Sequence, residues 1–397
     1  MNPAVHQPTS MQLLTSVQAY SACNENSSTY LARAQNLETE MRALRRDIHS
    51  NPELAYKEFE TSRLAEETLR RLGFTVRNGI AGTGLIAEIG SGKNIVAIRA
   101  EMDAVEIDEF NQVIYRSRRP NVMHACGHDA HVAAVLGAAE ILAQEKLPGR
   151  IRIIMQPAEE TADQEGHRGS YHMIANGALD DVKAILGLHV DATMPFGRIG
   201  VIENSLLELR NSFQININST DNKTPTGLAL GRLLTQLLEQ KSNNLWRNAN
   251  LQVSQINWCG GEDASFTGSF YADESSNAKL CEELTKTCTS ILNDHYHLTL
   301  QSNAPQIDMH KERIKQTFSA AQETLGAENV VAIRRKSWTK DFSVYANQAP
   351  ASFFLLGTQL PGQRMIQHTS TFDLEEKCLP IAAAVLASSA SKILSDK

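Results

Sequence analysis

The stretch VMHACGHDAH, residues 122–131, holds three histidines, one cysteine and one aspartate within ten positions. Imidazole nitrogens, thiolates and carboxylate oxygens are the side-chain ligands that zinc and similar divalent ions use in proteins. The same residue types also occur in polar loops that bind no metal. The stretch therefore has two interpretations, a metal site or a histidine-rich loop, and residues elsewhere in the chain must decide between them.

Further candidate ligands stand at the ends of apolar runs that are typical of strands. Glu159 and Glu160 end RIRIIMQPAEE, His189 comes near the end of AILGLHV, and His368 follows SFFLLG in MIQHTSTFD. Ligands of α/β sheets gather at the carboxyl ends of the strands. Two adjacent carboxylates at the end of a buried strand are also costly unless positive charge opposes them, and a metal ion supplies that charge.

Each of these residues also has a purely structural interpretation. A lone histidine at a strand end, such as His189 or His368, is more often a hydrogen-bonded core residue than a ligand. Cys126 alone would most often be a small buried apolar residue, and Glu159 with Glu160 could cap the following segment. Their joint occurrence favours a metal, but spacing alone leaves the two interpretations about equally supported.

The elements that would position these residues alternate along the first half of the chain. Helical spacing of apolar residues predicts one long helix over 27–54, stopped at Asn51-Pro52, and a second helix that ends near Gly73. Strands that alternate with helices predict an α/β fold with a mostly parallel, helix-covered sheet. The predicted strands are 84–90, 94–104, 150–160 and 184–190, and the helices between or after them are 129–145 and 169–179.

The pattern changes after about residue 204, where apolar and polar residues alternate as in half-exposed strands. The stretch GLALGRLLTQLLEQ (227–240) follows as an amphipathic helix, and long apolar runs return near residue 306. We therefore predict one domain built from residues 31–204 and 306–397. A smaller α+β domain is inserted at 205–305, and a lightly structured leader covers residues 1–30.

Net charge, hydropathy and cysteine content limit the kinds of binding partner and the cellular compartment that we predict. A net charge of −7 gives no reason to expect nucleic acid or an anionic membrane as partner, and we predict neither. No apolar run approaches the roughly 18 residues that a membrane span requires. Six scattered cysteines without a C-x-x-C pair do not indicate a disulfide scaffold, which favours a reducing, cytoplasmic location. No Lys or Arg precedes MQLLTSVQAYSAC, so a leader fits that stretch better than a secretion signal.

Eight motifs occur in chain order: LRRDIHSNPELAYKEFET, AIRAEMDA, MHACGHDAH, QPAEE, GSYHMIANGAL, LGLHV, TKDFSVY and QHTSTFDLEE. Together they resemble the amidohydrolase branch of the zinc aminoacylase/carboxypeptidase metallopeptidases. That branch includes hippurate hydrolase, N-acyl-amino-acid amidohydrolases and plant auxin-conjugate hydrolases. The resemblance covers residues 38–203 and 330–385, and MHACGHD together with PAEE is its most specific part.

The resemblance implies a di-metal catalytic domain at 31–204 and 306–397 and a lid domain at 205–305 that often forms a homodimer. It implies one or two divalent metal ions, Zn²⁺ or Mn²⁺, and Glu159 as the general base. The implied metal ligands are Cys126, His128, Glu160, His189 and His368. Two such ions about 3.5–4 Å apart would hold a water and polarise an amide carbonyl, while Glu159 moves the proton to the leaving nitrogen. A cysteine thiolate suits Zn²⁺.

Four other histidines have no matching ligand role, and we expect them near the site or on the surface: His124, His131, His167 and His172. We expect His124 to lie closest to the site. Glu101 stands where the family usually has aspartate, and Lys340 stands where it usually has glutamate.

The lid departs furthest from the family pattern. The family carries a GGHGA-type stretch whose histidine stabilises the oxyanion, but this chain has INSTDNKTP, with Lys223 or Asp221 at that position. The family's asparagine and arginine are missing from GGEDASFTGSFYADE. Lys223 is the predicted substrate-binding residue. The cluster at 334–336 could also replace the lost groups, although a solvated basic face explains that cluster more simply.

We therefore predict a metal-dependent amidohydrolase that cleaves the amide bond of an N-acyl or amino-acid-conjugated small molecule. One alternative uses the same metals to hydrolyse an aromatic amine or to form an amide in biosynthesis. The other is a catalytically silent binding protein, which the intact ligands and base argue against.

Overall fold

The computed structural model describes residues 27–202, 208–218, 225–240, 246, 249, 251–258, 260, 263–303, 310–333, 341–360, 362–363 and 365–396. The chain folds into two compact units. Unit 1 holds residues 1–204, 308–334 and 344–397, and unit 2 holds residues 205–307 and 335–343. Of the predicted leader, residues 27–30 begin the first described helix, and residues 1–26 lie outside the described part.

Unit 1 is built on an eight-stranded sheet with the order β1-β2-β4-β3-β5-β12-β6-β11. The central strands β4, β3, β5 and β12 run parallel, whereas β1, β2 and β6 pair antiparallel with at least one neighbour. This confirms the predicted α/β class. The strands are β1 (Thr75–Ile80), β2 (Gly84–Gly90), β3 (Ile95–Glu101), β4 (Arg150–Gln156), β5 (Val182–Pro195), β6 (Ile199–Ile202), β11 (Val330–Ile333) and β12 (Ala351–Gln359).

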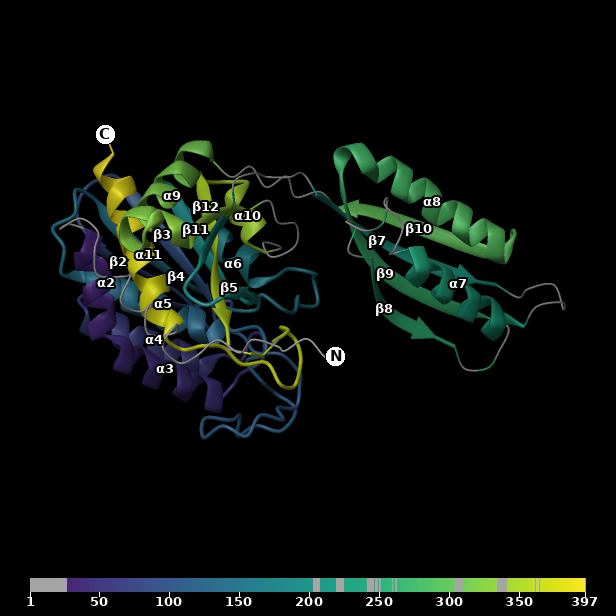
Figure 1. Ribbon diagram of the computed structural model, residues 1–397, viewed down its shortest axis with the longest axis horizontal. Coiled ribbons are helices and arrows are strands. Elements are labelled where there is room, and N and C mark those ends of the chain that lie inside the picture. Colours follow the sequence, from purple (N-terminus) through teal and green to yellow (C-terminus); the bar gives the residue numbers. More distant parts are fainter. Residues whose placement is uncertain are drawn as a thin grey trace, which may run out of the picture. The chain divides into compact units, whose positions relative to one another are not determined.

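Helices cover this sheet (Figure 1). They are α2 (Ser27–Asn36), α3 (Glu38–Ser50), α4 (Phe59–Arg71), α5 (His128–Ala143), α6 (Gly169–Ala175), α9 (Lys311–Leu325) and α11 (Cys378–Ser395), with a short 3₁₀ helix, η2 (Ala327–Asn329). Helix α10 (Phe342–Ala346) crosses the division between the two units.

Helix α5 is the central helix of unit 1, because it packs against α3, α11 and β3 and is apolar on nearly all sides. Gly137 permits the contact with α3, since a Cβ at this position would collide with the Met41 side chain. Strand β3 is buried along its whole length, as a central strand covered on both faces must be. The N-terminus of α5 is thereby held at the carboxyl end of the parallel strands.

The prediction of one long helix over 27–54 is wrong in one respect, because the structure has two helices there, α2 and α3. The chain breaks at Leu37, whose backbone (φ −93°, ψ 0°) leaves the helical region while its N–H donates to the Ala34 carbonyl. The break lets the two apolar faces meet different partners. Helix α2 packs against α11 and α9, whereas α3 packs mainly against α5.

Helix α11 corrects the expectation that no apolar run approaches membrane-spanning length. Its 18 residues have the length and hydropathy for a span, but 78% of that window is buried inside unit 1. It packs against α2, α5 and α9. A helix that is apolar all round is expected in a buried position of this kind.

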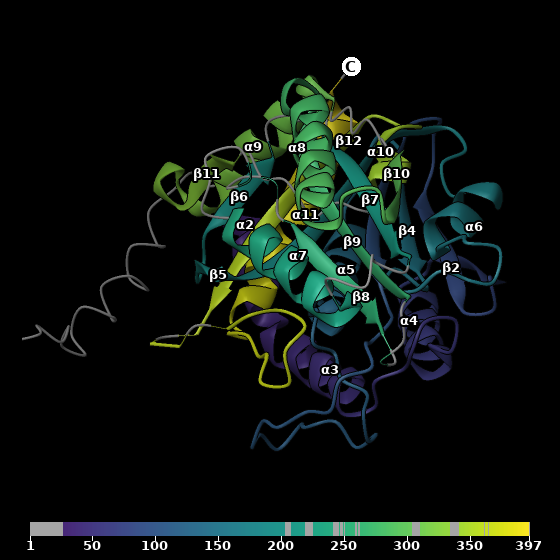
Figure 2. The same ribbon diagram turned by 90° about the vertical axis from the view of Figure 1, so that its right-hand side faces the viewer.

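Unit 2 is a four-stranded antiparallel sheet with the order β10-β7-β9-β8 and two helices packed on one face (Figures 1 and 2). Its core contains Phe213, Trp246, Phe266 and Phe270, with apolar residues of both helices. The one-sided sheet agrees with the alternating pattern of the sequence. The elements are β7 (Glu208–Ile217), α7 (Thr226–Gln240), β8 (Gln252–Asn257), β9 (Ala264–Asp273), α8 (Glu274–Leu292) and β10 (Tyr296–Asn303).

Candidate metal centre

The turn before α5 brings Cys126 and His128 together. Gly127 between them has φ +89°, and a Cβ at this position would collide with the Val190 side chain. Only glycine fits this left-handed turn without strain. The His128 ring lies 2.8 Å from the Asp103 carbonyl through Nδ1. Because a carbonyl only accepts hydrogen bonds, Nδ1 carries the proton and Nε2 is left as a free donor atom for a metal.

His189 reaches the same place from strand β5. Its Nδ1 lies 2.7 Å from the Val190 carbonyl, so this ring also keeps its proton on Nδ1. Its Nε2 lies 3.3 Å from the Cys126 sulfur. Both histidines are therefore held in the tautomer that a metal ligand needs.

Glu159 and Glu160 follow β4 in a strained turn, where Ala158 has φ +47°. The Glu160 backbone N–H donates to Asp103 Oδ2 at 2.8 Å, and the Ala158 N–H donates to buried Glu58 at 2.8 Å. Arg168 donates to the backbone oxygen of Glu159, and its guanidinium lies 3.8 Å from the Glu159 carboxylate. These contacts hold both carboxylates at the carboxyl end of the sheet.

His368 closes the cluster from the segment after β12. Its backbone is left-handed, with φ +60°, and its N–H donates to the Ala125 carbonyl at 2.9 Å. Its Nε2 lies 3.1 Å from Glu160 Oε1. A non-glycine residue in this conformation persists only where its surroundings impose it, and such residues concentrate at functional sites.

The six side chains form three overlapping groups whose ligand atoms lie within 4.8 Å of one another. The groups are Cys126–His128–His189, Cys126–Glu160–His368 and His128–Glu159–Glu160. The structure thus brings together all five predicted ligands and the predicted base.

The residues fit one or two divalent ions on two observations. Nε2 of His128 is buried and makes no hydrogen bond, which is costly unless another partner binds it. The set of imidazole nitrogens, a thiol and carboxylates is also the set that Zn²⁺ and related ions prefer.

The electrostatics of the cluster suit a cation. Burial works to raise the pKa of Glu160, but the contact with His368 and the nearby His128 lower it below its usual range. Burial lowers the pKa of His189 to about 3, so this imidazole is neutral. Burial raises the pKa of the Cys126 thiol. A bound cation would offset the cost of ionising this buried thiol, because it supplies an opposite charge beside the sulfur.

Two acidic residues support the cluster, and our sequence prediction gave them no role. Asp103 contacts both His128 and the Glu160 backbone. Glu101 pairs with Arg99 on one oxygen and accepts a 2.9 Å hydrogen bond from His131 on the other. Both lie at the end of β3 in AIRAEMDA, so their place at a carboxyl strand end was the available signal. The longer glutamate at position 101 reaches both partners.

His124 was expected to lie closest to the site, but the structure places His131 there. The His131 ring packs against His189 at a centroid distance of 4.6 Å and against His128 at 5.4 Å. His124 lies beside His49, at 6.3 Å, and belongs to none of the three groups. The sequence pattern alone does not show which of the two rings packs against the ligands.

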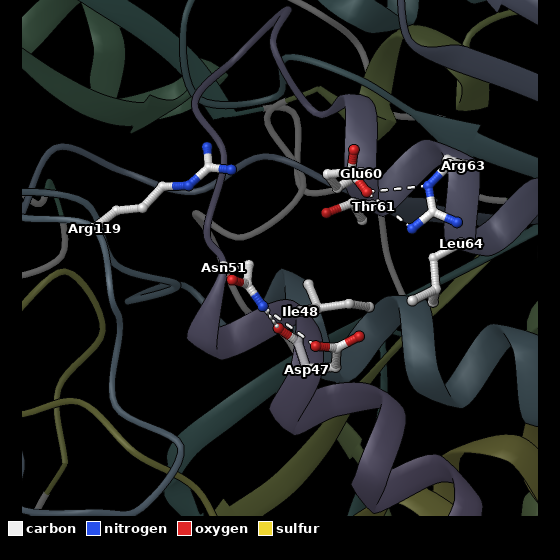
Figure 3. A pocket seen from close by; sticks show the side chains of 8 residues that line it. All are labelled: Asp47, Ile48, Asn51, Glu60, Thr61, Arg63, Leu64 and Arg119. Atoms are coloured by element: carbon white, nitrogen blue, oxygen red, sulfur yellow. Dashed lines mark hydrogen bonds and ion pairs between the residues drawn. The ribbon is translucent and has the colours of Figure 1, made fainter.

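The predicted substrate-binding Lys223 lies outside the described residues, as do Asp221, Lys340 and the cluster at 334–336. A separate pocket, with a volume of about 230 Å³, lies in unit 1. Figure 3 shows the side chains that line it. Its charged side chains pair locally, as Arg63 does with Glu60 at 2.8 Å, and none of its lining residues belongs to the metal cluster. It is lined by Asp47, Ile48, Asn51, Glu60, Thr61, Arg63, Leu64 and Arg119.

The fold and the cluster are those of a metal-dependent hydrolase, and the comparisons agree. Residues 97–392 match the model of Peptidase family M20/M25/M40. The chain is 33% identical to "IAA-amino acid hydrolase ILR1-like 6" of Arabidopsis thaliana, over 90% of this chain and 81% of that protein. It is 30% identical to "Thermostable carboxypeptidase 2" of Saccharolobus solfataricus, over 86% of this chain and 92% of that protein.

A solved structure is similar over both chains. The YXEP protein of Bacillus subtilis, described as a dinuclear metal binding peptidase from the M20 family, superposes with a TM-score of 0.74 at 26% identity. The match covers 91% of this chain and 99% of that one. The chain belongs to the M20 peptidase family, in its amidohydrolase branch, and is a hydrolase of amide or peptide bonds.

Proposed function

We propose that the protein is a metal-dependent amidohydrolase that cleaves the amide bond of an N-acyl or amino-acid-conjugated small molecule. The observation that carries this proposal is the convergence of six side chains in one cluster, in which Cys126, His128 and His189 are buried and His368 is open to solvent. The other two members are Glu159 and Glu160. Cys126, His128, Glu160, His189 and His368 would hold the ions. When bound, one or two Zn²⁺ or Mn²⁺ ions would supply Lewis acidity toward the amide carbonyl.

Glu159 is proposed as the general base. Its side chain is 15% exposed, so it faces the site without being sealed from substrate and water. In this role its carboxylate takes a proton from the attacking water and passes it to the leaving nitrogen. The neighbouring Arg168 orients Glu159 by donating to its backbone oxygen.

We propose an amino-acid conjugate with a large or aromatic acyl group as the preferred substrate. Similarity to IAA-amino acid hydrolases supports this class. The missing lid histidine, asparagine and arginine also support it, because a small substrate depends most on such polar partners. A substrate held mainly by unit 1 would need them less. A homodimer through α7 and a cytoplasmic location remain predictions.

The test combines metal content with hydrolysis. The protein is stripped of metal, reloaded with Zn²⁺ or Mn²⁺, and assayed on an IAA-amino acid and on N-acetyl amino acids. Cys126→Ala/His128→Ala should lose metal and turnover together. Cys281→Ala/His297→Ala removes the same residue types from unit 2 and should keep both. Full metal occupancy in the Cys126→Ala/His128→Ala variant would refute the ligand assignment.

A further inference from the structure

A second group of metal-ligating side chains lies outside the cluster described above. Asp163, His167 and His172 each offer a ligand atom, and these atoms lie within 4.8 Å of one another. The first two stand in the loop that follows Glu160, and His172 lies on α6. The group shares no residue with the candidate metal centre.

The loop holds Asp163 in one orientation. Its Oδ1 accepts backbone N–H groups of Glu165 and His167, each at 2.9 Å, and its own N–H donates to the His167 carbonyl at 2.8 Å. Gly166, with φ +85°, closes this tight turn. The other oxygen, Oδ2, is thereby directed at Nε2 of His172, 2.8 Å away.

The third ligand, His167, is equally well fixed. Its ring stacks on Tyr171 at a centroid distance of 3.7 Å and an interplanar angle of 4°. The Tyr56 hydroxyl donates to its carbonyl at 2.8 Å. Its Nδ1 is nevertheless buried and makes no hydrogen bond, and the Glu165 carboxylate lies 3.7 Å away.

The hydrogen bond between Asp163 and His172 explains why those two side chains lie together. It does not explain why His167 Nδ1 is buried beside them without a hydrogen bond. A histidine whose ring is locked by stacking, while a buried nitrogen has no hydrogen-bond partner, lacks one interaction. A cation among the three side chains would supply it and would also bind the Asp163 carboxylate. The side chains are 26% to 34% exposed, so an ion can enter from solvent and keep water as a further ligand.

We propose that Asp163, His167 and His172 form a second, peripheral site for a divalent transition-metal ion. Two imidazoles and one carboxylate suit ions of the Zn²⁺, Co²⁺, Ni²⁺ and Cu²⁺ class, and they suit Ca²⁺ or Mg²⁺ poorly. The site would brace the segment that carries Arg168, the residue in contact with Glu159. Its role is structural, and it does not depend on how many ions the candidate metal centre holds.

The experiment counts Zn²⁺. Parent protein and His167→Asn/His172→Asn are saturated with Zn²⁺ and dialysed, and zinc per chain is measured by elemental analysis. Titration calorimetry then follows Zn²⁺ binding to each metal-stripped protein. His295→Asn/His297→Asn, which removes two histidines from unit 2, is the matched control. Circular dichroism checks that each variant is folded.

The proposal predicts that His167→Asn/His172→Asn holds one Zn²⁺ fewer than the parent, while the control holds the same number. Asp163→Asn should weaken that one binding event at least tenfold, because it removes the anionic ligand and loss of even a supporting carboxylate weakens metal sites by about 10–100-fold. Equal zinc content and equal titrations in parent and His167→Asn/His172→Asn would overturn it. An equal loss of zinc in the control would also overturn it, since it would show unspecific histidine binding. Neither result bears on the candidate metal centre.

Discussion

Unit 1 and unit 2 use polar residues in opposite ways. Unit 1 buries charged and metal-ligating side chains at the ends of parallel strands, and every group of potential metal ligands in the described part of the chain lies there. Unit 2 has a conventional apolar core behind a one-sided sheet, and its polar residues lie mostly on the exposed face. The same contrast is visible in the sequence. The motifs shared with the family lie in unit 1 or at its boundary, whereas the departures from the family pattern lie mainly in unit 2. It teaches that bond-cleaving machinery and substrate recognition can diverge separately within one chain.

The strongest test of this contrast is the base in unit 1. Glu159→Gln keeps the shape of the side chain and removes the proton acceptor. We expect the metal to stay bound while kcat falls by about 10²–10⁴, the usual cost of losing a general base. Elemental analysis and steady-state kinetics on one preparation measure both quantities. Turnover close to that of the parent would show that another group activates the water.

The buried ion pairs of Arg45 should also contribute strongly to the free energy of unfolding of unit 1. Arg45 is fully buried and pairs with Asp129 at 2.7 Å, next to the ligand His128. Arg45→Met removes the guanidinium that this carboxylate shares with Asp373 and Glu376, and it leaves Asp129 buried with only His49 beside it. This should lower the free energy of unfolding by about 3–5 kcal/mol. Urea unfolding followed by circular dichroism measures the change. Arg63→Met removes an exposed arginine with two surface ion pairs and should change stability little. Equal effects of the two variants would mean that the buried network is not stabilising.

The altered lid should appear as a change in substrate preference. Removing one oxyanion-stabilising group typically slows catalysis by about 10²–10³. We therefore expect kcat/KM on hippurate below about 10⁴ M⁻¹s⁻¹, the low end of the usual enzyme range, and at least 10²-fold below that of a larger aromatic conjugate. Assays of the metal-loaded protein on both substrates measure the ratio. A hippurate value above that limit would show that the missing lid groups do not matter.

A smaller effect concerns pH and the buried His124. This side chain is 1% exposed and neither ring nitrogen makes a hydrogen bond, and burial lowers its pKa from 6.5 to about 3. Between those two pH values the unfolded chain binds a proton that the folded chain does not, so stability is lost as pH falls below 6.5. From pH 7.5 to 5 this amounts to about 2 kcal/mol.

The check is urea unfolding of metal-stripped protein at pH 7.5 and 5. His124→Asn should lose about 2 kcal/mol less than the parent between these pH values, because all other titrating groups are shared. The exposed His297→Asn variant should follow the parent. Parallel losses in parent and His124→Asn would show that His124 does not titrate as burial predicts.

Much of unit 1 could be predicted from the sequence, because its strands and the ligands that follow them stand next to each other in short motifs. Apolar strands followed by Glu160 or His189 place the ligands at one sheet edge whatever the details of packing. The break at Leu37 was not predictable in this way, since the apolar spacing runs through it and only the different partners of α2 and α3 separate the helices. The contacts of His131 with Glu101 and of His167 with Tyr171 depend on side-chain orientation, which spacing does not specify.

The central claim, that unit 1 assembles a metal centre, is tested most directly by a crystal structure of the Zn²⁺-loaded protein with anomalous scattering at the zinc edge. We predict one or two anomalous peaks about 2.0–2.3 Å from Cys126 Sγ and from Nε2 of His128 and His189. Glu160 and His368 should complete the coordination. Active, zinc-loaded protein with no peak among these five side chains would contradict the account.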